Sequence, residues 1–396
     1  MTPRFHWFLP TTGDRRALIG GGHSVPAGVG RPGERPGTAD RIRPPDIDYL
    51  AQIARSAEQL GFEAVLTPTG TWCEDAWLVT AALLRETSRL KFLVAFRPGF
   101  VSPTLAAQMA ATYQRISGGR LLLNVVTGGE SAEQRRFGDH LPHADRYART
   151  GEFLSVVRGA WTGEPYDFKG EHYHVEGAVV PRPPDPLPEI YFGGSSPAAG
   201  PVAARHTDVY LTWGEPPDQV AEKIEWIRGL AAGHGRSPRF GIRLHTISRD
   251  TSEAAWAEAR RLLDGVDPAH IDKAQEALAA SDSVGQRRMR ALHESYRAGD
   301  RAAGSERALE IHPNLWAGVG LVRGGAGTAL VGSHAEVADR IEEYAALGIE
   351  EFILSGYPHL EEAYWFGEGV IPELSRRAAA RAAATRGDGA DWEDDR

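Results

Sequence analysis

Eight short apolar runs recur along this chain, and a segment with helical periodicity follows each of them. Strands that alternate with helices form a parallel sheet, because each helix returns the chain to the edge where the strand began. Parallel strands are covered on both faces, which explains why the runs are largely apolar. Eight such strands predict an α/β fold, a closed (β/α)8 barrel of the TIM-barrel type. The predicted strands are residues 5–9, 64–67, 91–96, 121–127, 189–192, 208–213, 240–248 and 351–354.

Two of the intervening segments carry clear start and stop signals for helices. Asp46 follows two prolines and can cap a helix that Gly61 ends. Ser102 and Pro103 can begin a helix that ends at Gly118. We expect these helices to belong to the outer ring of the barrel.

Two segments interrupt the alternation, one after strand 1 and one between strands 7 and 8. Residues 13–45 are rich in glycine, proline and arginine and are too long for an ordinary loop. They are either an insertion at the barrel mouth that shapes substrate access or a disordered surface insertion. Residues 265–332 begin with polar helical sequence and end in a glycine-rich stretch. We expect one domain over residues 1–376 and a flexible tail over residues 377–396.

The composition and residue order exclude several classes of protein. The formal net charge of −9 argues against a broad nucleic-acid-binding face. No apolar run approaches the roughly 20 residues of a membrane-spanning helix, and the N-terminus lacks a signal-peptide pattern, so we expect a cytoplasmic protein. Cys73 is the single cysteine, which excludes an intrachain disulfide, and no partner base for it is identifiable. The histidines show no metal-ligand spacing, so no metal site is expected.

The carboxyl ends of barrel strands are where active sites form. Arg243 and His245 are two residues apart on the seventh predicted strand, so their side chains point to the same face. An unpaired guanidinium is costly to bury, so this pair suggests a bound anion. The alternative is an arginine paired with a carboxylate and a histidine satisfied by the backbone. Other residues near predicted strand ends are Thr69, Cys73, Arg97, Asn124, Thr127, Trp213, Tyr357 and His359.

A second candidate binding element follows the fifth predicted strand. Gly194, Ser195 and Ser196 precede an alanine-rich helical segment, so backbone N–H groups and hydroxyls can converge at a helix N-terminus. That geometry binds phosphate. The chain has no dinucleotide fingerprint and no P-loop, so a monophosphate fits better than a dinucleotide; a plain tight turn is the alternative.

The glycine-rich residues 323–330 do not follow a recognisable strand, which argues against a nucleotide-binding loop. They are either a mobile lid that carries Arg323 and excludes water, or a surface loop with a solvated arginine.

Longer motifs extend in order over nearly the whole chain: residues 7–11 (WFLPT), 73–77 (CEDAW), 124–129 (NVVTGG), 191–196 (YFGGSS), 210–216 (YLTWGEP), 240–245 (FGIRLH), 314–332 and 355–364 (SGYPHLEEAY). By these motifs the chain resembles the two-component flavin-dependent alkanesulfonate monooxygenases of the bacterial luciferase superfamily. In that family, FMN is used as reduced FMNH2, which a separate NAD(P)H-dependent FMN reductase supplies. With FMNH2 and O2, enzymes of the family convert a sulfonate to an aldehyde and sulfite in sulfur assimilation. The resemblance also implies a homodimer or homotetramer.

The resemblance implies roles for individual residues. The catalytic set would be Arg243, His245, Tyr357, Arg323 and Trp213, with guanidinium groups matched to sulfonate oxygens and either His245 or Tyr357 moving a proton. The cofactor would contact Ser195, Ser196, Gly194, Tyr147, Thr127, Gly128 and Asn124. The substrate pocket would include Cys73, Trp72, Thr12 and Arg97.

The sequence departs from the family beside the predicted mouth. Thr12 stands where relatives commonly have histidine, Thr71 and Trp72 stand where they have arginine and serine, and segment 13–45 is longer. The expected substrate is therefore an alkanesulfonate or a bulkier aryl- or sugar-sulfonate such as sulfoquinovose. Two other hypotheses are a related flavin enzyme that acts on an aldehyde, a sulfone or another heteroatom, and a non-catalytic flavin-binding barrel.

Overall fold

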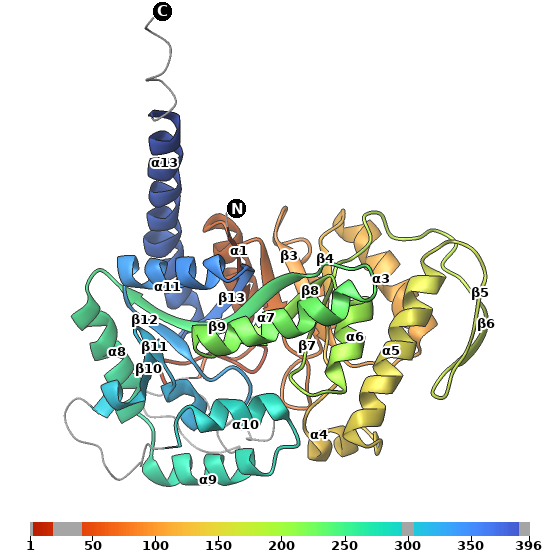
Figure 1. Ribbon diagram of the computed structural model, residues 1–396, viewed down its shortest axis with the longest axis horizontal. Coiled ribbons are helices and arrows are strands. Elements are labelled where there is room, and N and C mark those ends of the chain that lie inside the picture. The colour runs from red at the N-terminus through yellow and green to blue at the C-terminus, as the bar shows by residue number, and fades with distance from the viewer. Residues whose placement is uncertain (1–2, 19–41, 295–304, 388–396) are drawn as a thin grey trace, which may run out of the picture.

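A computed structural model describes residues 3–18, 42–294 and 305–387. Its parallel strands close into an eight-stranded barrel in the order β1–β2–β3–β4–β7–β8–β9–β13, with β13 paired back to β1 (Figure 1). The barrel strands are β1 (Arg4–Phe8), β2 (Ala64–Thr67), β3 (Lys91–Phe96), β4 (Leu121–Val125), β7 (Ile190–Gly193), β8 (Val209–Trp213), β9 (Arg239–Arg249) and β13 (Ile349–Ser355). All eight predicted strands and the TIM-barrel class are confirmed.

Helices surround this barrel and begin at the expected capping residues. Asp46 accepts a hydrogen bond from Tyr49 N at 2.8 Å at the start of α1, and Ser102 accepts from Leu105 N at 3.3 Å at the start of α3. The α3 helix ends at Gly118, whose φ of 67° is left-handed, a conformation that suits glycine. The helices around the barrel are α1 (Ile47–Gln59), α2 (Ala76–Leu83), α3 (Pro103–Ser117), α4 (Ser131–Arg136), α5 (His143–Ala160), α6 (Ala199–His206), α7 (Pro217–Ala232), α11 (His334–Ala346) and α12 (His359–Trp365).

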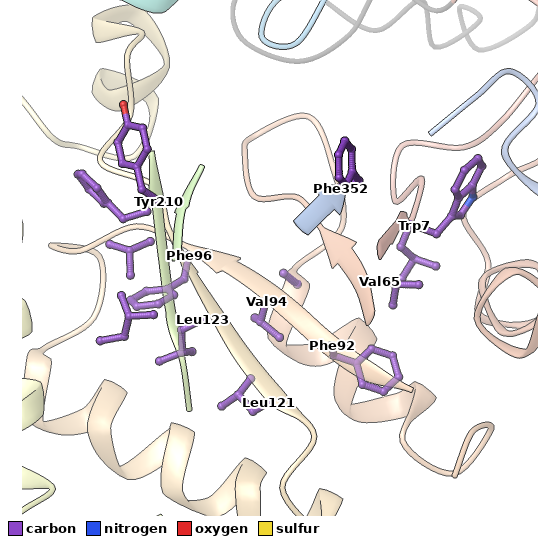
Figure 2. Packing of buried hydrophobic residues seen from close by; sticks show 14 of the residues in the cluster. Trp7, Val65, Phe92, Val94, Phe96, Leu121, Leu123, Tyr210 and Phe352 are labelled. Atoms are coloured by element: carbon purple, nitrogen blue, oxygen red, sulfur yellow. The ribbon is translucent and has the colours of Figure 1, made fainter. Parts of the chain in front are cut away.

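The barrel strands alternate between a helix-facing side and an interior side. Phe92, Val94 and Phe96 of β3 belong to the cluster packed against the helices (Figure 2), whereas Leu93 belongs to the interior cluster. The interior cluster comprises Phe8, Ala64, Leu66, Leu93, Leu122, Tyr191, Val209 and Ile353. Because every strand is covered on both sides, the functional residues are confined to the strand ends and the loops.

A buried polar cluster lies where the barrel strands begin. The Glu351 carboxylate, with no exposed surface, accepts hydrogen bonds from Tyr191 Oη at 2.6 Å and Arg239 Nη2 at 2.9 Å, and lies 3.0 Å from His6 Nε2. Burial alone would raise the pKa of Glu351. Interactions with His6, Tyr191 and Arg239 outweigh this effect and lower the pKa to about 2. The cluster ties β1, β7, β9 and β13 together at the end opposite the expected active site.

The second interruption forms a cap that is joined to the barrel wall. The cap begins with α8 (Ser252–Asp264), which lies before the expected start of the interruption at residue 265. It continues with α9 (Pro268–Ala279), α10 (Val284–Ala291), the 3-10 helices η1 (Ser305–Leu309) and η2 (Gly318–Leu321), and strands β10 (Glu310–His312), β11 (Leu315–Trp316) and β12 (Ala329–Ser333). In Figure 1, α9 and α10 lie together at the lower edge of the molecule. β12 pairs in parallel with the C-terminal half of β9, with Ala329 opposite His245. β12 was not predicted, and it begins within the glycine-rich residues 323–330.

Three further features differ from the sequence-based expectations or fall outside the described residues. A hairpin of β5 (Tyr166–Lys169) and β6 (His174–Ala178) was not predicted. After the π-helix η3 (Phe366–Val370), α13 (Ile371–Gly387) extends into the expected tail as far as Gly387 and projects from the body (Figure 1). Arg377 binds Glu373, Asp339 and Glu342, which explains why the helix runs past residue 377. Of insertion 13–45, residues 19–41 lie outside the described residues.

No helix in the described part of the chain has the length and apolarity needed to cross a membrane.

Candidate active site

A single pocket at the carboxyl ends of the barrel strands gathers most of the predicted site residues. Strand ends form its walls, and α10 and the loop 323–326 contribute from the cap. It brings together Trp72, Asn124, Thr127, Gly128, Tyr147, Gly194, Ser195, Ser196, Trp213, Arg243 and Arg323. The residues assigned to an anion and those assigned to a phosphate therefore line one cavity.

Arg243 enters this pocket from β9 without an ionic partner. Its side chain donates from Nη2 to Ser355 Oγ at 2.8 Å and from Nη1 to the carbonyls of Leu244 and Ile353. The guanidinium carbon lies 5.0 Å from the centroid of the Phe8 ring. Burial is the main cause that lowers the pKa of Arg243 well below its ordinary value, and the charge of Arg323 is the second. No carboxylate among the described residues pairs with the Arg243 guanidinium. Such an arrangement favours a bound anion.

Arg323 supplies the second cation from the 323–326 loop. Its guanidinium carbon lies 5.5 Å from the same Phe8 centroid, and Nη1 lies 2.8 Å from His245 Nε2. No ion pair joins Arg323 to a carboxylate within the part of the chain that the structure describes. Two guanidinium groups thus converge near one aromatic ring at the pocket wall, where an anion with several oxygens could bind both.

His245 lies behind the arginines rather than on the pocket wall. Its Nδ1 is 2.8 Å from Ser355 Oγ, and its Nε2 is 3.2 Å from the Ala326 carbonyl as well as close to Arg323. Burial and the charges of Arg243 and Arg323 lower the pKa of His245 well below its ordinary value, so the ring is neutral. Tyr357 stacks on it at a centroid distance of 5.4 Å with an interplanar angle of 15°, and like His245 it does not belong to the pocket lining.

The residues 193–196 form a tight turn before α6, and the glycines there leave no room for side chains. A Cβ on Gly194 would lie 2.6 Å from Ala199 Cβ and 3.0 Å from Tyr147 Oη. Tyr210 Oη donates to the Gly194 carbonyl at 2.7 Å and so fixes the turn. Ser196 Oγ is buried beside the Tyr147 hydroxyl, and no side chain caps the start of α6. A buried hydroxyl next to an uncapped helix N-terminus fits a phosphate.

Three predicted pocket residues are not part of the pocket lining. Arg97 forms a buried ion pair with Glu133 at 2.7 Å. Cys73 Sγ lies 3.7 Å from the Pro68 carbonyl, and burial raises the pKa of the thiol to about 12, so it is not a thiolate nucleophile at neutral pH. Thr12 is half-buried in the turn after β1.

Some pocket and supporting residues were not predicted, and they come from both the cap and the barrel. Gln286 of α10 accepts a hydrogen bond from Gly325 N at 2.8 Å and so holds the Arg323 loop, while Glu130, Ser283 and Phe8 line the pocket. Nothing in the sequence places α10 over the barrel mouth. Ser355, in contrast, is the last residue of β13, and inspection of strand ends could have found it.

No group of three or more His, Cys, Asp or Glu side chains suited to a metal ion occurs among the described residues.

Taken together, a closed eight-stranded barrel with a phosphate-type turn and an anion-type pocket at its mouth has the architecture of a TIM-barrel enzyme. The model of the luciferase-like monooxygenase family matches residues 4–351, and the chain belongs to this family. The superfamily named from the sequence motifs is confirmed, while its sulfonate-processing branch stays a prediction.

Solved structures share this fold across almost their whole length. The chain is similar to riboflavin lyase, with 20% identity, a TM-score of 0.74, and coverage of 96% of this chain and 92% of that chain. A long-chain alkane monooxygenase gives 19% identity and a TM-score of 0.72, with coverage of 96% and 92%. EDTA monooxygenase from Chelativorans sp. BNC1 gives 19% identity and a TM-score of 0.67, with coverage of 96% and 95%. At these identities the similarity establishes the shared fold.

Proposed function

We propose that this protein is a reduced-FMN-dependent monooxygenase that cleaves the carbon–sulfur bond of an organosulfonate. The supporting observation is the pair Arg243 and Arg323, two cations without a carboxylate partner among the described residues, in the same pocket as the 193–196 turn. In the reaction, the sulfonate, FMNH2 and O2 give an aldehyde, bisulfite, FMN and water. The C–S bond breaks, one oxygen atom of O2 becomes the aldehyde oxygen, and the other leaves as water.

The pocket residues fit an FMN cofactor. Ser195, Ser196 and the N-terminus of α6 would hold the phosphate, since the Ser196 hydroxyl is buried beside Tyr147 and no side chain caps the helix. Asn124, Thr127 and Gly128 would lie along the rest of the cofactor. Arg146 donates to the Gly128 carbonyl at 3.2 Å and so fixes that wall. When bound, reduced FMN supplies the electrons that activate O2.

The remaining residues bind and orient the substrate. Arg243 and Arg323 hold the sulfonate oxygens and stabilise the negative charge that the departing sulfite gains. The 323–326 loop, held by Gln286, excludes water from the pocket. Both ring nitrogens of His245 are engaged in contacts with Ser355 and Arg323. We therefore assign proton transfer to the hydroxyl of Tyr357, a residue beside the pocket lining that forms no hydrogen bond within the described chain.

A sulfite-release assay with a separate NAD(P)H-dependent FMN reductase tests this function. A panel of alkane-, aryl- and sugar-sulfonates is incubated with the full-length protein, and sulfite and aldehyde are quantified. We expect equimolar sulfite and aldehyde from at least one sulfonate, and none when the reductase is omitted.

Two outcomes would replace the proposal with a rival. If the protein binds FMN but releases no sulfite across the panel, the non-catalytic flavin-binding hypothesis is favoured. If it oxidises a neutral substrate and keeps that activity in Arg243→Met and Arg323→Met, the two cations do not serve an anion and a different superfamily reaction is favoured.

The phosphate site makes a separate prediction about FMN affinity. Ser196→Ala removes a buried hydroxyl that would donate to the phosphate, and a hydrogen bond to a charged group contributes about 1.5–3 kcal/mol. We therefore expect FMN to bind about tenfold more weakly or worse, measured by calorimetric titration. Ser155→Ala is the matched control, because Ser155 Oγ donates to the Gly151 carbonyl within α5, away from the pocket lining. Equal FMN affinity in the two variants would place the phosphate elsewhere.

A further inference from the structure

Four side chains form an unbroken chain of hydrogen-bond contacts between the two pocket arginines. Arg243 Nη2 donates to Ser355 Oγ at 2.8 Å, Ser355 Oγ lies 2.8 Å from His245 Nδ1, and His245 Nε2 lies 2.8 Å from Arg323 Nη1. The chain joins β9, β13 and the 323–326 loop. Ser355, its central hydroxyl, has no exposed surface and no role in the substrate binding described above.

The direction of these hydrogen bonds follows from the chemistry of the donors. A guanidinium only donates, so at this distance His245 Nε2 must accept from Arg323. The neutral ring then carries its proton on Nδ1 and donates it to Ser355 Oγ. Ser355 Oγ consequently accepts from both His245 and Arg243. The Ala326 carbonyl, 3.2 Å from His245 Nε2, receives no proton from that atom in this tautomer.

We propose that Ser355 is a positioning residue that couples the two anion-binding arginines through His245. Arg243 is fixed on a barrel strand, whereas Arg323 is carried by a loop of the cap, and two like charges repel one another before an anion arrives. The neutral Ser355–His245 pair supplies an acceptor to each guanidinium and so sets their separation without adding a charge. The role in sulfonate binding rests on the proposed function, but the hydrogen-bond chain itself does not.

A double-mutant cycle measures this coupling. Methanesulfonate is titrated calorimetrically into the full-length protein saturated with oxidised FMN, and the melting temperature of each variant is recorded. We expect Ser355→Ala to weaken methanesulfonate binding about tenfold, which corresponds to about 1.4 kcal/mol, and Ser355→Thr to restore most of it because it keeps the hydroxyl. In an Arg323→Ala background, Ser355→Ala should cost less than about twofold, because interacting residues are not additive.

The control uses a second serine–histidine contact, made by the same strand β9. Ser248 is 1% exposed and its Oγ lies 2.6 Å from His334 Nδ1, but Ser248 lies outside the pocket lining. Ser248→Ala should leave methanesulfonate binding unchanged. If Ser355→Ala and Arg323→Ala have additive effects, Ser355 does not couple the arginines and the proposal is overturned.

The His245 tautomer gives a readout that needs no sulfonate. In 15N-histidine-labelled protein, with the His245 signal assigned by its loss in His245→Gln, we expect an Nδ1-protonated ring in the wild type and a mixture of tautomers in Ser355→Ala. An Nε2-protonated ring in the wild type would contradict the chain. If the wild type binds no sulfonate, the proposed function fails. The tautomer measurement then still tests whether the hydrogen-bond chain exists.

Discussion

Replacing Arg243 with alanine is expected to lower kcat/KM for sulfite release about 100-fold or more, the usual cost of removing one donor that stabilises transition-state charge. The arginine is 7% exposed and has no carboxylate partner among the described residues, so in the proposed function its partner is the sulfonate. Arg243→Lys should retain more of the wild-type kcat/KM than Arg243→Ala but not all of it, because an ammonium cannot make the bidentate contact of a guanidinium with a sulfonate. Steady-state sulfite release with the FMN reductase in excess measures both variants.

The control for this variant is an arginine outside the pocket. Arg115 of α3 donates to the carbonyl of Arg182 on the exposed surface, and Arg115→Ala should leave kcat/KM unchanged. If Arg243→Ala keeps more than a tenth of the wild-type kcat/KM with an unchanged melting temperature, the anion site is not at Arg243.

Glu351→Ala is expected to lower the free energy of unfolding by about 3–5 kcal/mol, the usual cost of removing one partner from a buried charged network. The change leaves His6, Tyr191 and Arg239 without their shared acceptor inside the barrel. Urea unfolding followed by circular dichroism measures the difference. Glu63→Ala is the control, since the pair of Glu63 and Lys91 at the same end of the barrel is partly exposed and such pairs contribute about 0–1 kcal/mol.

The pKa of Glu351 also predicts how the difference in unfolding free energy between wild type and Glu351→Ala depends on pH. The pKa of Glu351 is lowered from 4.5 to about 2 in the folded protein. A carboxyl group whose pKa is lower in the folded than in the unfolded protein stabilises the fold fully when the pH is above its unfolded-state pKa. This stabilisation is lost as the pH falls toward the folded-state pKa. The gap in unfolding free energy between wild type and Glu351→Ala should therefore shrink between about pH 4.5 and pH 2. A gap that stays constant over this window would show that Glu351 is not ionised in the fold.

The barrel was predictable because its signal is local and repeated. Each β-strand is covered on both sides, so runs such as the one containing Phe92 and Val94 are apolar at consecutive positions. β12 was missed because its residues follow a run of glycines and its pairing partner is β9, more than 80 positions earlier in the chain. The β5–β6 hairpin was missed because its strands are short and half-exposed.

The candidate site was predictable where a residue's place in the chain indicates a ligand. Arg243 and Ser196 were singled out because strand ends and helix N-termini are known places for ligands. Gln286 was not found, because its contact with Gly325 depends on how the cap folds over the barrel. The neutral state of His245 was also beyond the sequence, since it depends on burial beside Arg243 and Arg323.

The pairing of β9 with β12 bears on how such enzymes can diversify. Residues 250–328 leave the barrel at the end of β9 and return on the strand beside it, so the ends of the segment lie on the order of 15 Å apart. A segment whose ends are close can be replaced by one of different length at little entropic cost. Recombination at these two junctions would exchange the part of the pocket wall that the cap contributes, while the eight-stranded barrel and the 193–196 segment stay unchanged.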